Sequence, residues 1–305
     1  MKVTVIKVSM IEGKGYDAMK PLLFAIMDEV TPKDIQVEYL DERIEDLPEK
    51  IDSDIIAFSV ETFAARRAYK LAKKYKTKKN TIVMGGFHPT MLPDEALEYC
   101  DTVLIGDAED TWPAFLKDYQ KGKAKKEYKS THKIDIAKID YNSKVYDGKK
   151  YNKIGLVQFS RGCKFNCDFC SVRSFYNCKV RQKSTKDIVD EIKKIKEKII
   201  FFIDDNIFLD EKSAIELFDA IKPLKKKWAC QISMDVAFND KLLKKMKESG
   251  CILVLMGFES LNPKNLKLMN KTANLNIKKY EEAIKNIYKY KLMIYGTFVL
   301  GYDYD

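Results

Sequence analysis

Strand-like and helix-like segments alternate along the whole chain, and this alternation is the feature that most limits its possible folds. The strand-like runs are apolar or β-branched with little polar alternation, as expected for strands that are buried on both faces. Amphipathic stretches follow most of them, and in residues 62–75 the side chains of Ala65, Ala68 and Leu71 share one face. Repeated strand–helix units with short connections predict α/β domains with parallel sheets.

The first 120 residues predict a doubly wound, Rossmann-like domain. Its expected strands are 3–9, 35–41, 54–60, 81–86 and 102–107, and its expected helices are 16–30, 62–75, 94–99 and 110–120. Ligands of such sheets bind outside the carboxyl ends of the strands. The loops 59–62, 85–90 and 106–109 therefore form the candidate binding edge, where the adjacent glycines Gly85 and Gly86 would let a large flat ligand approach the backbone.

Residues 121–150 are expected to be a basic linker between two domains. Residues 121–153 hold eleven lysines and four acidic residues, so this segment accounts for most of the formal charge of +10. It contains no arginine, and its only aromatic residues are tyrosines. We therefore expect a solvated connection with His132 at its surface, and no nucleic-acid partner.

Several protein classes are disfavoured by composition. No stretch approaches the roughly 18–20 apolar residues of a membrane span, and the N-terminus does not have the pattern of a secretory signal. The odd count of seven cysteines argues against a disulfide framework. We expect a cytoplasmic protein whose cysteines remain reduced.

Three cysteines, Cys163, Cys167 and Cys170, follow the apolar run 154–160 with the spacing C-x3-C-x2-C. A strand that leads into a short glycine- and cysteine-rich loop can bring three thiolates together. A 4Fe–4S cluster normally takes four protein thiolates, so three would leave one iron open to another ligand, as in catalytic metal sites. A structural zinc site with Cys178 as the fourth ligand is the alternative, although zinc ligands usually come as two separated pairs.

Residues 151–305 repeat the alternation, with expected strands at 154–160, 199–204, 228–233, 252–257 and 293–300. Expected helices begin near Ser184 or Thr185 and span 211–222, 240–249 and 276–290. Active sites of βα barrels lie at the carboxyl ends of the strands. The cysteine loop follows the first of these strands, so the other strand ends should complete one pocket with it.

The cysteine spacing, with the aromatic Phe169 directly before the third cysteine, resembles the radical S-adenosylmethionine (SAM) superfamily. The resemblance implies a partial (β/α)6 barrel, of which five strands are present and the last helix and strand are missing from this sequence. It implies a 4Fe–4S cluster on the three cysteines, whose open iron binds SAM and cleaves it to a 5′-deoxyadenosyl radical. The SAM-binding residues that it implies are Phe169, Asp204, Asp205, Asn206, Ser233, Asp235, Glu259, Gly296 and Gly301.

The string Gly-Gly-Phe-His-Pro-Thr at 85–90, with residues 93–97 and 103–109, resembles the cobalamin-binding domain that precedes many radical SAM cores. The cobalamin-binding residues that it implies are Ser59, Glu61, Thr62, Gly85, Gly86, Phe87, His88, Gly106, Asp107 and Glu109. Many other cobalamin proteins carry a cobalt-ligating histidine in the first loop. Loop 9–16 has no histidine here, so we expect no histidine ligand from it.

Together these resemblances imply a cobalamin-dependent radical SAM enzyme that methylates an unactivated carbon. Its cofactors would be a 4Fe–4S cluster, SAM and cobalamin, and its partners a small-molecule, lipid or peptide substrate and an electron donor such as flavodoxin or ferredoxin. A radical rearrangement or cyclisation is an alternative, as is a non-catalytic corrinoid-binding protein. A tRNA methylthiotransferase is also an alternative, but that family carries three further cysteines in its first domain, whereas residues 1–120 hold only Cys100.

Overall fold

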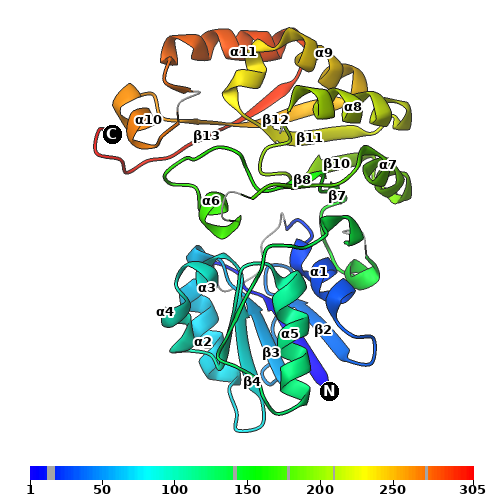
Figure 1. Cartoon of the computed structure of the whole chain (residues 1–305), viewed down its shortest axis with the longest axis vertical. Coiled ribbons are helices and arrows are strands. Elements are labelled where there is room, and N and C mark those ends of the chain that lie inside the picture. Colours follow the sequence, from blue (N-terminus) through cyan, green and yellow to red (C-terminus); the bar gives the residue numbers. More distant parts are fainter. Residues whose placement is uncertain (12–17, 140–142, 177–178, 209, 272–273) are drawn as a thin grey trace. The chain divides into compact units, whose positions relative to one another are not determined.

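The computed structural model describes residues 1–11, 18–139, 143–176, 179–208, 210–271 and 274–305. The chain divides into two compact units, Met1–Asn152 and Lys153–Asp305, and each is a parallel sheet with helices packed on it (Figure 1). The expected α/β class, a Rossmann-like domain followed by a partial barrel, is confirmed. No helix within the described ranges is long and apolar enough to cross a lipid bilayer.

The first unit contains a six-stranded parallel sheet in the order β2-β1-β3-β4-β5-β6. Because the order reverses between β1 and β3, the edge at their carboxyl ends is a topological switch point, where doubly wound sheets bind ligands. The register pairs Ile6 with both Leu40 and Phe58. The strands are β1 (Lys2–Lys7), β2 (Gln36–Asp41), β3 (Ile55–Ser59), β4 (Thr81–Gly85), β5 (Thr102–Ile105) and β6 (Glu127–Lys129).

Helices cover both faces of this sheet. The helices are α1 (Leu22–Val30), α2 (Ala65–Tyr75), α3 (Phe87–Met91), α4 (Pro93–Leu97) and α5 (Ala108–Gln120). Ala65, Ala68 and Leu71 on α2 are buried, as the sequence pattern predicts. The first expected helix begins later than predicted, because Pro21 occupies its N-cap position in an extended conformation; the start of the expected range, up to residue 17, lies outside the described residues.

The described residues of segment 121–150, which the sequence predicts to be a linker, belong to the first unit. Its strand β6 pairs with β5, and Tyr128 is buried there. The Tyr146 hydroxyl donates a hydrogen bond to the Pro21 carbonyl oxygen at 2.8 Å, and directly after the segment the Tyr151 hydroxyl donates one to Asp41 at 3.0 Å. A three-residue strand between lysines gives almost no sequence signal, whereas these tyrosines fasten the segment to the unit.

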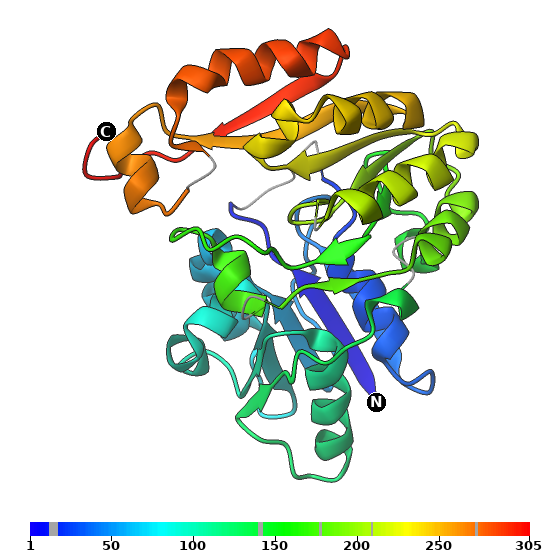
Figure 2. The ribbon, with the colours of Figure 1, turned by 45° about the horizontal axis from the view of Figure 1, so that its top comes forward.

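The second unit contains a five-stranded parallel sheet in the order β13-β12-β11-β10-β7. Figure 2 shows helices α8, α9 and α11 along one face of it. Its strands are β7 (Gly155–Val157), β10 (Ile199–Phe202), β11 (Lys227–Ile232), β12 (Cys251–Glu259) and β13 (Met293–Phe298), with a small antiparallel pair, β8 (Ser160–Arg161) and β9 (Arg181–Gln182). Its helices are α6 (Ser171–Tyr176), α7 (Thr185–Lys194), α8 (Glu211–Ile221), α9 (Asp240–Ser249), α10 (Pro263–Leu268) and α11 (Tyr280–Lys289).

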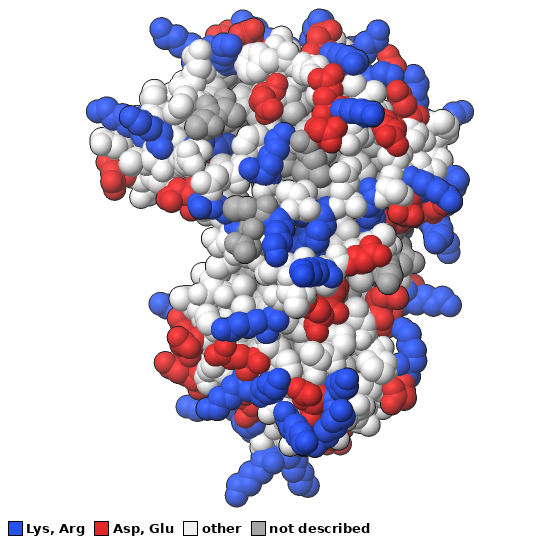
Figure 3. All heavy atoms as spheres, in the orientation of Figure 1, with Lys and Arg blue, Asp and Glu red and all other residues white. Residues whose placement is uncertain are grey.

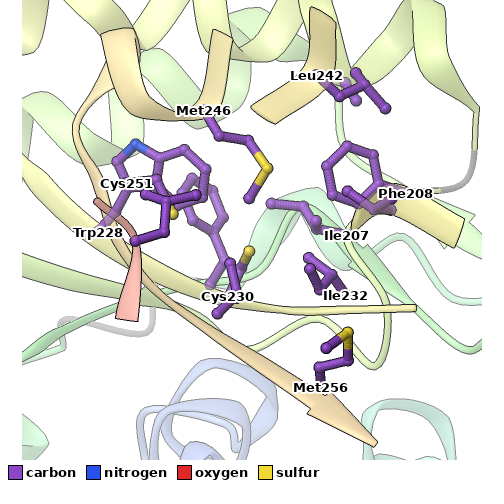
Figure 4. Packing of buried hydrophobic residues seen from close by; sticks show 14 of the residues in the cluster. Ile207, Phe208, Trp228, Cys230, Ile232, Leu242, Met246, Cys251 and Met256 are labelled. Carbon is purple, nitrogen blue, oxygen red and sulfur yellow. The ribbon is translucent and has the colours of Figure 1, made fainter. Parts of the chain in front are cut away.

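The core of the second unit is built around Trp228. Its ring stacks on Phe218 with the centroids 5.2 Å apart, and its Nε1 donates a hydrogen bond to the Ser249 carbonyl oxygen at 3.0 Å. Cys230 and Cys251 lie in the same core (Figure 4), as expected for cysteines that pack as small apolar residues. Burial and the neighbouring Cys251 raise the pKa of Cys230, so this thiol is unreactive.

Basic and acidic side chains are interspersed over much of the face drawn in Figure 3. Exposed lysines also gather at the turns before β4 and before β6 in the first unit, at the amino ends of the strands. They are Lys78, Lys79, Lys121, Lys123, Lys125 and Lys126.

Candidate functional site

A small pocket with a volume of about 40 Å³ opens at the carboxyl edge of the first unit's sheet. Four of the predicted cobalamin-binding residues line it: Ser59, Gly85, Gly86 and Gly106. The remaining lining residues are mostly apolar and come from strands β1, β3, β4 and β5 and helices α1 and α5. They are Val5, Leu23, Met27, Ala57, Phe58, Val83, Leu104, Ala108 and Trp112.

The glycines of this edge differ in what they do. A Cβ atom at Gly86, where φ is +106°, would lie 2.8 Å from the Val60 carbonyl oxygen, and one at Gly106, where φ is +88°, would lie 2.8 Å from the Ser130 Cβ. A Cβ at Gly85 would meet nothing closer than Leu104, at 3.5 Å. The backbone conformation therefore requires glycine at positions 86 and 106. Gly85 is not required in this way, and it lines the pocket without a side chain.

Asp107 is not among the residues that line the pocket. Its buried Oδ2 lies 2.8 Å from Nδ1 of His132, and the backbone of His132 takes up a left-handed conformation with φ of +56°. The prediction that His132 lies at the surface is wrong, because its side chain is only 17% exposed. Asp107 and His132 together join the start of α5 to the segment after β6.

The other predicted residues of this edge lie around the pocket rather than in its wall. Glu61 accepts a hydrogen bond from the buried Lys7, while Thr62 is exposed. Phe87 and Glu109 are half-buried in the first turns of α3 and α5.

His88 is turned into the helix packing of the first unit. It is buried, and its Nε2 lies 2.8 Å from the Tyr69 hydroxyl and 3.3 Å from Glu95 Oε1. These partners belong to α2 and α4, so His88 fastens α3 to its neighbouring helices and is not among the residues that line the pocket.

In the second unit, Cys163, Cys167 and Cys170 lie in one short loop, residues 162–170, between β8 and α6. Cys167 is buried and the other two are half-buried. The loop begins at Gly162, where φ is +93° and a Cβ atom would lie 2.2 Å from the Lys179 carbonyl oxygen. Only glycine fits this turn, which explains the glycine directly before the first cysteine.

The three thiols lie close enough to one another for their charges to interact. Burial raises the pKa of Cys163, and the neighbouring charges of Cys170, Asp205 and Cys167 raise it further. Among the described residues no three His, Cys, Asp or Glu side chains converge on a single metal ion. The thiolates of a 4Fe–4S cluster bind separate irons, so they need not meet at one point. The proposed fourth zinc ligand, Cys178, lies outside the described residues.

Asp204, predicted to bind SAM, is instead turned inward. It is fully buried, with its Oδ2 accepting a hydrogen bond from Phe159 N at 3.0 Å and its Oδ1 accepting two from Ser160, from N at 2.5 Å and Oγ at 2.6 Å. Burial raises its pKa to about 7, even though these bonds oppose the shift. Asp204 therefore holds the corner between β7 and β8 that leads into the cysteine loop.

Neighbouring polar residues extend this support. Asp205 accepts a hydrogen bond from Gly162 N at 2.8 Å, which holds the first turn of the cysteine loop. Asn206 is buried and donates to the Ser233 hydroxyl at 3.3 Å, which joins the ends of β10 and β11. The structure brings Asp205, Asn206 and Ser233 together at one edge, as the sequence predicts.

The remaining predicted SAM-binding residues differ in exposure. Phe169, Asp235, Gly296 and Gly301 are exposed. Glu259, at the end of β12, is buried and pairs with Lys271, whose Nζ lies 3.0 Å from Glu259 Oε1. No sequence pattern singles out Lys271, because it follows the helix α10 and not a strand.

Comparison with known proteins agrees with both halves of this arrangement. The B12 binding domain family matches residues 10–116, and the radical SAM superfamily matches residues 157–304. The radical SAM methyltransferase TsrM from Kitasatospora setae, solved with cobalamin and a [4Fe-4S] cluster bound, shares the fold with a TM-score of 0.74 at 12% identity, over 98% of this chain and 69% of that chain.

Several sequence relatives are methyltransferases. Bacteriochlorophyllide d C-12(1)-methyltransferase of Chlorobaculum tepidum is 31% identical over 97% of this chain and 68% of its own length. Hopanoid C-2 methylase of Rhodopseudomonas palustris is 25% identical over 73% of this chain and 45% of its own length. The expected cofactors, a 4Fe–4S cluster, SAM and cobalamin, are those of this family. The chain belongs to the radical SAM enzymes that carry a cobalamin-binding domain and act as methyltransferases.

Proposed function

We propose that this enzyme adds a methyl group to an unactivated carbon of a large apolar ring compound. The observation that carries the proposal is the 31% identity with a bacteriochlorophyllide methyltransferase, which extends over 97% of this chain. The hopanoid methylase, another relative, is named for a different apolar ring system. Both relatives are thus named for a substrate with a large ring system.

Exposed apolar side chains in the second unit support an apolar substrate. Phe298, at the end of β13, stacks on Phe258 with the ring centroids 5.6 Å apart and is itself half exposed. Tyr295 and Leu300 are exposed on the same strand and just after it, and Leu261 is exposed just after β12. Flat aromatic and aliphatic surface of this kind suits a ring compound better than a charged substrate.

The site residues follow from the same proposal. Cys163, Cys167 and Cys170 would hold the cluster, while Asp205, Asn206, Ser233 and Glu259 would line the SAM site with Phe169. When bound, the cluster would supply the electron that cleaves SAM, SAM would supply the radical that acts at carbon, and cobalamin would supply the methyl group. The chain itself orients them and excludes water.

In the first unit, Ser59, Gly85 and Gly106 would meet cobalamin in the apolar pocket. Because His88 is engaged with Tyr69 and Glu95, we do not assign it a contact with cobalt. We further propose a cytoplasmic location and an external electron donor such as flavodoxin or ferredoxin.

The test is product analysis under anaerobic conditions. The reconstituted enzyme, with cobalamin, a reductant and SAM carrying a deuterated methyl group, is incubated with a tetrapyrrole or a hopanoid. Both 5′-deoxyadenosine and S-adenosylhomocysteine should form, and the label should appear in the ring compound by mass spectrometry. Formation of both products with no label in the tetrapyrrole or the hopanoid would contradict the ring proposal.

A second reaction is favoured by one further relative. The anaerobic magnesium-protoporphyrin IX monomethyl ester cyclase of Cereibacter sphaeroides is 24% identical over 88% of this chain. Deoxyadenosine without S-adenosylhomocysteine, in the presence of a ring substrate that is consumed, would favour such a cyclisation over methylation. Neither product from cluster-replete, reduced enzyme would favour a corrinoid-binding protein without catalysis.

A further inference from the structure

The segment after β12 is hydrogen-bonded to the cysteine loop. Asp168 N donates a hydrogen bond to the Met269 carbonyl oxygen at 3.0 Å. The Asn270 side chain donates another to the Asn166 carbonyl oxygen at 2.8 Å. The loop that carries the three cysteines is therefore held by a segment about 100 residues further along the chain, just after α10.

Lys271 directly follows Asn270, and its ammonium group lies near the cysteine loop. Its Nζ lies 3.0 Å from Glu259 Oε1 and 6.0 Å from the ring centre of Phe169, which precedes the third cysteine. The two charged side chains are only 19% and 7% exposed. A charge so little exposed is weakly screened by water and salt, so it acts on its neighbours more strongly than a surface lysine would.

The backbone is strained where it presents the partner of Lys271. Glu259 has φ of +68°, a left-handed conformation that is uncommon for a residue with a side chain. A Cβ atom at Gly257 would lie 1.9 Å from Glu259 Oε1, so a larger residue there would displace the carboxylate from this position. Such strain persists where the surrounding structure holds the residue in place. Here the surrounding structure holds Glu259 in its pair with Lys271.

Lys271 and Glu259 act in opposite directions on a group bound at the cysteine loop. The Lys271 cation lies over the ring of Phe169, which belongs to this loop, so it stabilises negative charge added there. The Glu259 carboxylate, which is hydrogen-bonded to Lys271, disfavours added negative charge.

We propose that Lys271 is a positioning residue that fixes the cysteine loop and makes the cluster bound there easier to reduce. Reduction adds one negative charge to the cluster, and the potential of iron–sulfur clusters depends on nearby charge and hydrogen bonding. A weakly screened cation beside Phe169, in the loop that carries the three ligands, shifts that equilibrium toward the reduced form. The inference rests on the presence of the cluster and not on the identity of the substrate.

The experiment is a redox titration of the reconstituted cluster, followed by electron paramagnetic resonance without SAM or substrate. We compare the parent protein with Lys271→Met, Lys271→Arg and Lys267→Met, the last being an exposed lysine in the final turn of α10. Lys271→Met should make reduction about tenfold less favourable, which for a one-electron couple is a shift of 59 mV to more negative potential. Lys271→Arg and Lys267→Met should titrate like the parent.

Glu259→Gln provides the opposite change, because it removes the carboxylate and leaves the cation, so it should raise the potential. An unchanged potential in Lys271→Met, or a Glu259→Gln potential that does not rise, would overturn the proposal. If Lys271→Met loses its iron while Lys271→Arg keeps it, the positioning role is supported, and Glu259→Gln decides the effect of charge. Loss of iron in both Lys271 variants would overturn it. Because no SAM is cleaved, the result is independent of any failure of methyl transfer.

Discussion

The two sheets end differently at their carboxyl edges. In the first unit the edge is an apolar pocket, and none of α1, α2 or α5 begins with a side-chain cap hydrogen bond. In the second unit buried polar groups such as Asp204 and Asn206 bond to other parts of the chain, and α7, α8 and α9 are each capped by a side chain. The first edge therefore presents an apolar surface, whereas at the second edge the polar groups hold one loop in place.

The largest expected effect is the loss of bound iron when the three cysteines of loop 162–170 are replaced. The triple change Cys163→Ala, Cys167→Ala and Cys170→Ala should abolish the binding of about four irons per chain that three-thiolate ligation of a 4Fe–4S cluster predicts. Iron and sulfide analysis with the absorbance near 400 nm measures the loss. Cys230→Ala is the control, since Cys230 lies in the core. Stoichiometric tetrahedral zinc in protein purified without oxygen would contradict the cluster assignment.

The second effect is a loss of cobalamin affinity when a large side chain fills the pocket of the first unit. Ala108 lines the pocket, so Ala108→Trp should weaken cobalamin binding at least about tenfold by occupying the volume that the ligand needs. Ala114→Trp is the matched control, because Ala114 is exposed on the same helix. Binding is measured by absorbance titration with hydroxocobalamin. Equal affinity of the two folded variants would place the ligand elsewhere. Gly86 is unsuitable for this test, since its φ of +106° makes any side chain strained.

The third effect concerns pH. The pKa of Asp204 is raised to about 7 from an ordinary value of 3.8, so the folded state binds a proton more tightly than the unfolded state does. Its contribution to stability is therefore complete below about pH 4 and is lost as the pH rises toward 7, by a few kcal/mol. Urea unfolding followed by circular dichroism between pH 5 and 8 should show this decline in the parent protein.

Asp204→Asn should be less stable at low pH, since one acceptor is lost, but its stability should change far less over the same range. Asp235→Asn, at an exposed carboxylate, should keep the parent profile. A decline of equal slope in the parent and in Asp204→Asn would assign the pH dependence to other groups.

The smallest effect tests the capping difference. Ser184 Oγ accepts a hydrogen bond from Asp187 N at the start of α7, at 3.1 Å. Ser184→Ala should lower the free energy of unfolding by about 1 kcal/mol. Thr62→Ala, at an exposed residue that makes no cap to α2, should change it by less than about 0.5 kcal/mol. Equal losses in both variants would remove the distinction between the units.

Much of the fold could be predicted because buried strands have strong local signals. The run 252–257 lies within β12, and the Ser184 cap of α7 is formed as predicted. By contrast, β6 was missed because three residues between lysines carry no apolar pattern. Only its pairing with β5 makes it a strand, and pairing is a non-local property.

The site shows the same division. The cysteine spacing predicts which thiols share a loop, because all three are local in sequence. Asp204 and Asp205 are adjacent, yet one is fully buried and bonded to the β7–β8 corner while the other holds Gly162. Lys271 was missed for a related reason, since its contact with Glu259 depends on how the segment after α10 folds back.

The chain contains two tryptophans, Trp112 and Trp228, and one is buried in each unit. Trp112 also lines the pocket of the first unit and donates a hydrogen bond to the Thr31 hydroxyl at 2.9 Å. A strongly coloured ligand that enters this pocket would lie beside Trp112 and quench its fluorescence, while Trp228 reports on the packing of the other core. The natural sequence thus carries its own pair of optical reporters, which can follow ligand entry and the unfolding of each unit without an added dye.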